Sequence, residues 1–119
     1  MKTRQIAVAC LLACAALLLP RVALAHAHLL TSTPAANAAV HGPDIAIDLK
    51  FNSRVEVKGS MIVLVLPGGK TQRLNLDAQS NEVSLDAHAH LAPGSYTLRW
   101  QALSTDGHIT RGEIPFTVR

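Results

Sequence analysis

The sequence predicts an all-β domain, a β-sandwich or Greek-key barrel of about seven short strands, behind an N-terminal export signal. Past residue 25, apolar residues mostly recur with period two, as they do in strands that bury one face. Gly, Pro, Asn and Asp break these runs at short intervals, which is typical of turns between strands. No stretch outside the export signal has the period of a helix.

The strands are predicted one after another along the chain. An extended N-terminal segment comes first, and residues 31–43, rich in Ala, Asn, Gly and Pro, have no clear period. Apolar and small or polar residues then alternate through 45–51, and the Pro-Gly-Gly turn at 67–69 predicts a hairpin. The other predicted strands are 61–66, 71–76, 82–86, 95–103 and 113–118.

The first 25 residues have the parts of a signal peptide. Lys2 and Arg4 precede an apolar run over 6–19, which is short for a membrane span of roughly 20 apolar residues. The small residues of Ala23-Leu24-Ala25 form a cleavage pattern, so we expect a signal peptide at 1–25 and a single domain at 26–119. The alternative of lipoprotein processing at Cys14 would leave an apolar segment stranded outside the lipid.

Removing the signal changes what the composition implies. Lys2, Arg4 and Arg21 account for the whole formal charge of +3, so the expected mature domain is neutral. Binding to nucleic acid is therefore not expected, because it depends on clustered Lys and Arg. Cys10 and Cys14 also precede the cleavage site, which leaves neither a disulfide nor a thiolate ligand in the domain.

An N-terminal histidine offers a metal ion two nitrogens, its free α-amine and its imidazole Nδ1. Both groups lose their protons near neutral pH, which suits a strong Lewis acid such as Cu(II). Asp106 and His108 follow the Trp100 strand, and if the backbone is extended they project to the same side across Gly107. With His26 they supply three nitrogens and one carboxylate oxygen, a set that fits the tetragonal preference of Cu(II).

A set of motifs is spread along the whole expected mature chain, and its most distinctive part runs from a Pro-Gly turn through Trp to Ser-x-Asp-Gly-His. The motif residues are His26-Ala27-His28-Leu29, Thr33-Pro34, Leu91-Ala92-Pro93-Gly94-Ser95-Tyr96, Trp100, Ser104, Asp106-Gly107-His108, Gly112 and Phe116-Thr117-Val118. In these motifs the chain resembles the CopC family of periplasmic copper-resistance proteins.

This resemblance implies an immunoglobulin-like Greek-key β-sandwich that binds Cu(II) through His26, Asp106 and His108. Two departures from the family pattern matter. Met61 is the only methionine past the signal, so we expect a Cu(II)-only protein without the methionine-rich Cu(I) site of some members. Arg54 stands where the family commonly has an acidic residue, which puts any role of residues 51–55 in doubt.

The expected function is that of a monomeric periplasmic carrier or buffer that binds Cu(II), catalyses nothing and delivers copper to a membrane partner, by family analogy a CopD-type inner-membrane protein. One alternative is a copper mono-oxygenase with an N-terminal histidine chelate. Only Tyr96 and Trp100 could stack on its substrate, and both are predicted to lie in a core strand. Another is an adhesion or assembly sandwich whose histidines are incidental.

Three other histidines have weaker claims to a metal. His28, third in the mature chain, could bind Cu(II) together with the α-amine and two deprotonated backbone amides, a mode that excludes the assembled site and needs an unstructured terminus. It is otherwise an additional ligand or a group that orients the site. His88 and His90 could make an adventitious Zn(II) or Cu(II) site, although a solvated loop is the simpler interpretation.

Overall fold

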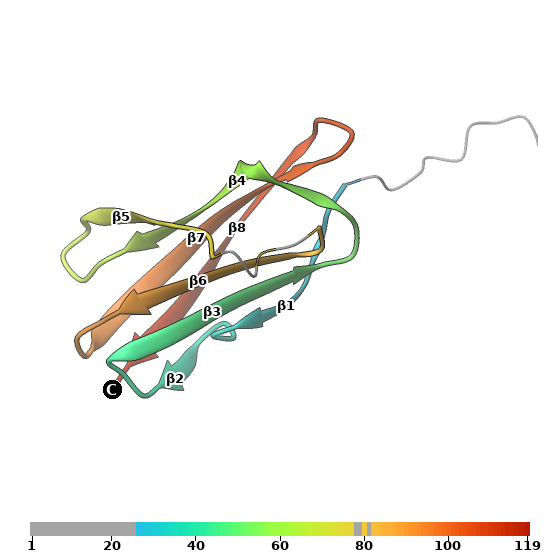
Figure 1. The fold of residues 1–119 in the computed structure, drawn as a ribbon. Coiled ribbons are helices and arrows are strands. Elements are labelled where there is room, and N and C mark those ends of the chain that lie inside the picture. The colour runs from blue at the N-terminus through green and yellow to red at the C-terminus, as the bar shows by residue number, and fades with distance from the viewer. Residues whose placement is uncertain (1–25, 78–79, 81) are drawn as a thin grey trace, which may run out of the picture.

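The computed structural model describes residues 26–77, 80 and 82–119, so the predicted signal peptide and Cys14 lie outside the described residues. Two β-sheets face each other (Figure 1), one of three strands in the order β1-β3-β6 and one of five in the order β2-β8-β7-β4-β5. The strands are β1 (Leu29–Thr33), β2 (Ala38–Val40), β3 (Asp44–Phe51), β4 (Val55–Val65), β5 (Thr71–Leu74), β6 (Ser84–His90), β7 (Gly94–Ser104) and β8 (Ile109–Val118).

The N-terminal segment changes sheets, which accounts for eight described strands where the sequence predicts about seven. β1 pairs antiparallel with β3, whereas β2 pairs parallel with β8 in the other sheet. Between them Asn37 has a φ of 64°, a conformation that Asn adopts more readily than most residues. The short β2 lies inside 31–43, where Ala and Gly hide any period-two signal.

The core lies between the two sheets and confirms the predicted alternation. Along β3 every second side chain is buried, and Trp100 on β7 meets Phe51 edge to face with ring centroids 5.3 Å apart. β4 and β5 form the predicted hairpin, with Val65 opposite Thr71. The buried apolar residues from β3, β4 and β7 are Ile45, Ile47, Leu49, Phe51, Val55, Ile62, Leu64, Tyr96, Leu98, Trp100 and Ala102.

One hydrogen bond at the start of β7 is typical of immunoglobulin-like sandwiches. The Tyr96 hydroxyl donates to the Ala92 carbonyl four residues upstream, at 2.6 Å, which is the arrangement known as a tyrosine corner. β3 and β6 are neighbours in one sheet, while β4, β7 and β8 are neighbours in the other, as the Greek-key connection of that fold requires. The expected fold class is therefore confirmed.

Three strands extend further than their sequence pattern predicts. β4 begins at Val55 rather than near Met61, β6 continues to His90, and β8 begins at Ile109 rather than near Glu113. His88 and His90 thus lie on a strand paired with β3, and their interpretation as loop residues is wrong. Within the described part of the chain, no helix is long and apolar enough to span a membrane.

Three segments meet at one end of the sandwich (Figure 1). They are the chain that enters β1, the turn between β3 and β4, and the turn between β7 and β8. The β4–β5 turn and the C-terminus lie at the opposite end. The end where the three segments meet holds His26, Asp106 and His108, which come from the first and the third of them.

Candidate metal centre

The β7–β8 turn brings Asp106 and His108 to the same side. Ser104 accepts from the amide of Gly107 at 2.9 Å, and its own amide donates to the His108 carbonyl at 2.8 Å. Gly107 has a φ of +88°, which L side chains rarely adopt. The expectation of an extended backbone here is wrong, but the tight turn still places both side chains together, with His108 Nδ1 3.0 Å from Asp106 Oδ2.

The chain entering β1 adds His26 to this pair. His26 Nδ1 is 4.0 Å from Asp106 Oδ2, and the two imidazole rings meet edge to face with centroids 4.3 Å apart. One ligand atom from each of the three residues lies within 4.8 Å of the others, which makes this the one such group of three among residues 26–77, 80 and 82–119. Two nitrogens and a carboxylate oxygen fit a borderline divalent ion such as Cu(II) or Zn(II).

Hydrogen bonds keep the Asp106 carboxylate charged. The backbone N–H of His108 donates to Asp106 Oδ1 at 3.1 Å and is the largest cause that lowers the pKa of this carboxyl from 3.8. The imidazoles of His108 and His26 lower the pKa further, while desolvation opposes them. The carboxylate is thus available as an anionic ligand throughout the neutral range.

The three candidate ligand side chains are open to solvent, whereas the backbone that follows His26 is buried. The His26, Asp106 and His108 side chains are 40%, 28% and 64% exposed, so an ion or a partner protein can reach them directly. Ala27, directly after His26, is fully buried. Its amide donates to the Ser104 hydroxyl at 2.9 Å, and its carbonyl accepts from the Thr110 hydroxyl at 2.8 Å.

His28 is exposed, and the structure does not bring it into the group of three. Its backbone is paired with Asn52 in the β3–β4 turn: the His28 amide donates to Asn52 Oδ1 at 2.8 Å, and the Asn52 amide donates to the His28 carbonyl at 3.0 Å. The same turn contains Arg54, whose guanidinium pairs with Glu82 at 3.1 Å on the exposed surface.

His88 and His90 project from β6 but belong to separate pairs. His88 Nδ1 contacts the Asp77 carboxylate, and His90 Nδ1 lies 2.9 Å from Asp44 Oδ1. Asp77 is joined to the outer edge of β6 through its amide, whereas Asp44 is on the neighbouring strand β3. The two imidazoles therefore have carboxylate partners on opposite sides of β6.

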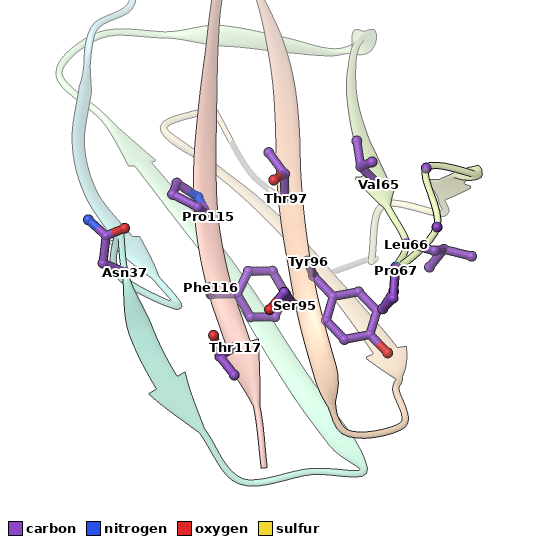
Figure 2. Close-up of a pocket in the computed structure, with 12 residues that line it drawn as sticks. Asn37, Val65, Leu66, Pro67, Ser95, Tyr96, Thr97, Pro115, Phe116 and Thr117 are labelled. Carbon is purple, nitrogen blue, oxygen red and sulfur yellow. The ribbon is translucent and has the colours of Figure 1, made fainter.

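A hollow lined by residues of β4, β7 and β8 lies away from this site. It measures about 630 Å³ and is lined by the β4–β5 turn and the outer ends of β7 and β8, including Val65, Thr97 and Pro115 (Figure 2). Ser95 and Tyr96, which line this hollow, lie at the start of β7, whereas Asp106 lies just beyond the other end of that strand. None of its lining residues is charged or a histidine, so the donor group and this hollow are separate features.

Together the fold and the side-chain group define a class of protein, an immunoglobulin-like β-sandwich with a candidate metal centre at one end. The CopC domain family matches residues 29–119, and the chain belongs to the CopC family. The predicted resemblance is thereby confirmed.

Relatives and solved structures agree with this assignment. Protein YobA of Escherichia coli K12 is 37% identical over 100 residues, which cover 80% of each chain. The crystal structure of CopC from Methylosinus trichosporium OB3b superimposes with a TM-score of 0.69 at 32% identity, covering 78% of this chain and 93% of that one. PcoC, described as a methionine-rich copper resistance protein from Escherichia coli, gives 0.65 at 28% identity, covering 79% and 99%.

Proposed function

We propose that this chain is exported, cleaved after Ala25, and binds one Cu(II) ion through His26, Asp106 and His108. The observation that carries the proposal is the approach of these three side chains to within 4.8 Å of one another from the two ends of the domain sequence. Cleavage would add the α-amine of His26 as a fourth donor. Three nitrogens and one anionic oxygen suit the tetragonal geometry that Cu(II) prefers.

The donor types favour Cu(II) over Cu(I). Cu(I) prefers thiolate and thioether ligands. Past residue 25 the sequence has no cysteine, and Met61 is its only methionine. PcoC, a structural relative, is by contrast described as methionine-rich. We therefore assign this chain to Cu(II) alone.

The role that fits best is a periplasmic copper carrier or buffer that works as a monomer. A carrier must release its ion to another protein, and the ligands are reachable from solvent, with His108 64% exposed. We propose a membrane protein of the CopD type as the acceptor, which would approach the end of the sandwich that holds His26 and the β7–β8 turn.

A carrier accounts for the structure better than a copper mono-oxygenase does. An oxygenase of that class needs a face that binds its polymeric substrate, commonly with exposed aromatic rings. Tyr96 and Trp100 are only 6% and 8% exposed and pack inside the sandwich. The proposed activity is therefore binding and transfer of copper without catalysis.

The test compares the natural N-terminus with one extended by a single residue. Intact mass of the exported protein should give a chain that begins at His26. Titration with Cu(II) against a competing chelator should then give a one-to-one complex. Adding one N-acetylated glycine before His26 should weaken that complex sharply, because the α-amine of His26 becomes an amide and no free amine replaces it, while circular dichroism stays unchanged. Equal affinity in both forms would contradict the proposal.

A further inference from the structure

The backbone amides of Ala27 and His28 are already committed as hydrogen-bond donors. The Ala27 amide donates to Ser104 Oγ at 2.9 Å, and the His28 amide donates to Asn52 Oδ1 at 2.8 Å. Ala27 is fully buried, and the Ser104 side chain that accepts from it is buried too. The two carbonyls are also occupied, by the Thr110 hydroxyl and the Asn52 amide.

These two amides are the ones that a competing copper chelate would need. A free N-terminus with histidine in third place can surround Cu(II) with four nitrogens: the α-amine, the amide nitrogens of the second and third residues, and the third-residue imidazole. In this chain the amides would be those of Ala27 and His28. Each would have to release its proton to solvent, leave its side-chain acceptor and form a bond to the metal.

We propose that Ser104 and Asn52 are specificity-determining residues that select the coordination mode of the N-terminus. By holding the Ala27 and His28 amide protons they exclude the four-nitrogen chelate at His28. The α-amine and imidazole of His26 are then left for the site shared with Asp106 and His108. This inference rests on the proposed function, and neither Ser104 nor Asn52 is among the proposed ligands.

The location of the two acceptors explains why both are needed. Ser104 is the last residue of β7 and holds Ala27 inside the sandwich, which keeps the amide nitrogen out of reach of solvent. Asn52 lies in the exposed β3–β4 turn and holds the next residue from the other side. Removing either acceptor alone would free one of the two required amides, so a single substitution should weaken the selection in part and the double substitution should abolish it.

The experiment uses the exported protein that begins at His26, loaded with one equivalent of Cu(II), with electron paramagnetic resonance as the readout. The natural protein should give a signal with mixed nitrogen and oxygen ligands that is unchanged by His28→Ala. The Ser104→Ala/Asn52→Ala double variant should change to the four-nitrogen signal and release two additional protons per copper. Adding His28→Ala to the double variant should abolish the four-nitrogen signal.

Two controls separate selection of the ligands from general loss of stability. Ser60→Ala is matched to Ser104→Ala, because Ser60 is 3% exposed and its hydroxyl accepts from the Leu103 amide at 3.0 Å and donates to the Glu56 carbonyl, whereas Ser104 accepts from the amide of Ala27. It should keep the natural signal. Asn52→Asp retains the acceptor oxygen and should also keep it, whereas Asn52→Ala alone should give a partial change even if the double variant does not fold.

The outcomes distinguish the inference from the function on which it rests. Mixed-ligand signals in the natural protein and in every folded variant would overturn the role of Ser104 and Asn52 while leaving the proposed copper site intact. A change of signal in Ser60→Ala equal to that in Ser104→Ala would also overturn it. A four-nitrogen signal in the natural protein that His28→Ala removes would overturn both proposals.

Discussion

Replacing His108 with alanine tests the candidate metal centre most directly. The ring lies 3.0 Å from Asp106 Oδ2 and stacks edge to face on His26, so it is central to the group of three. Its side chain is 64% exposed and lies in a turn, and surface substitutions of this kind change the free energy of unfolding by less than about 0.5 kcal/mol. Copper binding and folding should therefore separate in this variant.

The expected loss of affinity follows from the number of donors. Four-ligand structural zinc sites bind with about 10–16 kcal/mol, which is about 3 kcal/mol for each ligand. A factor of ten in affinity corresponds to about 1.4 kcal/mol, so losing one imidazole of the four donors should weaken Cu(II) binding about 100-fold. The backbone amide of His108 still donates to Asp106 Oδ1 in the variant, so the carboxylate should keep its orientation.

The assay is competition for Cu(II) with a chelator of known affinity, accompanied by thermal unfolding of the apo forms. His90→Ala is the matched control, since that imidazole is also exposed and paired with a carboxylate, Asp44, at 2.9 Å. The control should bind Cu(II) as the natural protein does. An affinity unchanged by His108→Ala, or lowered equally by His90→Ala, would refute the assignment of His108 as a ligand.

Two further predictions concern the scaffold. Burial, the hydrogen bond with Asp86 and its charge raise the pKa of Asp48 above 3.8, so ionised Asp48 weakens folding at neutral pH and this penalty disappears as pH falls below 3.8. Asp48→Asn should therefore raise the free energy of unfolding at pH 7 by less than about 1 kcal/mol, seen as a higher Tm. This gain should be lost by pH 3, and a gain that persists in acid would show another cause. A Cβ on Gly112 would lie 2.6 Å from the Trp100 indole. Gly112→Ala should therefore lower the free energy of unfolding by about 1–3 kcal/mol, and Tm by about 4–8 °C for each kcal/mol lost. An unchanged Tm would mean that the indole moves freely.

The fold was largely predictable because its strands bury one face. Alternation in β3, where Ile47 and Leu49 are fully or almost fully buried, is a local property that sequence shows directly. The period-two pattern could not be recognised where the side chains that point into the core are small. Ala87 and Ala89 gave β6 too weak a pattern to reach His90, and only pairing with β3 makes that segment a strand.

The sequence pointed to the candidate ligands but not to the residues that hold the N-terminal segment in place. The donor types of His26, Asp106 and His108 predict a copper site from the sequence, and the structure brings the three side chains together. Nothing in the sequence pointed to Asn52 and Thr110, because the side chain of each is hydrogen-bonded to the backbone of a residue 24 or 83 positions away in the chain. The turn that contains Asn52 was doubted on account of Arg54, which only pairs with Glu82 at the surface.

The sequence by itself determined the alternation of buried and exposed positions and the absence of cysteine past residue 25, and it predicts cleavage before His26. Each of these is a property of residues that are near neighbours in the chain. The tertiary structure decided that His26 meets the β7–β8 turn and that the amides after it are occupied by Ser104 and Asn52. Those contacts depend on how two sheets pack, which fixes distances between segments that no local pattern relates.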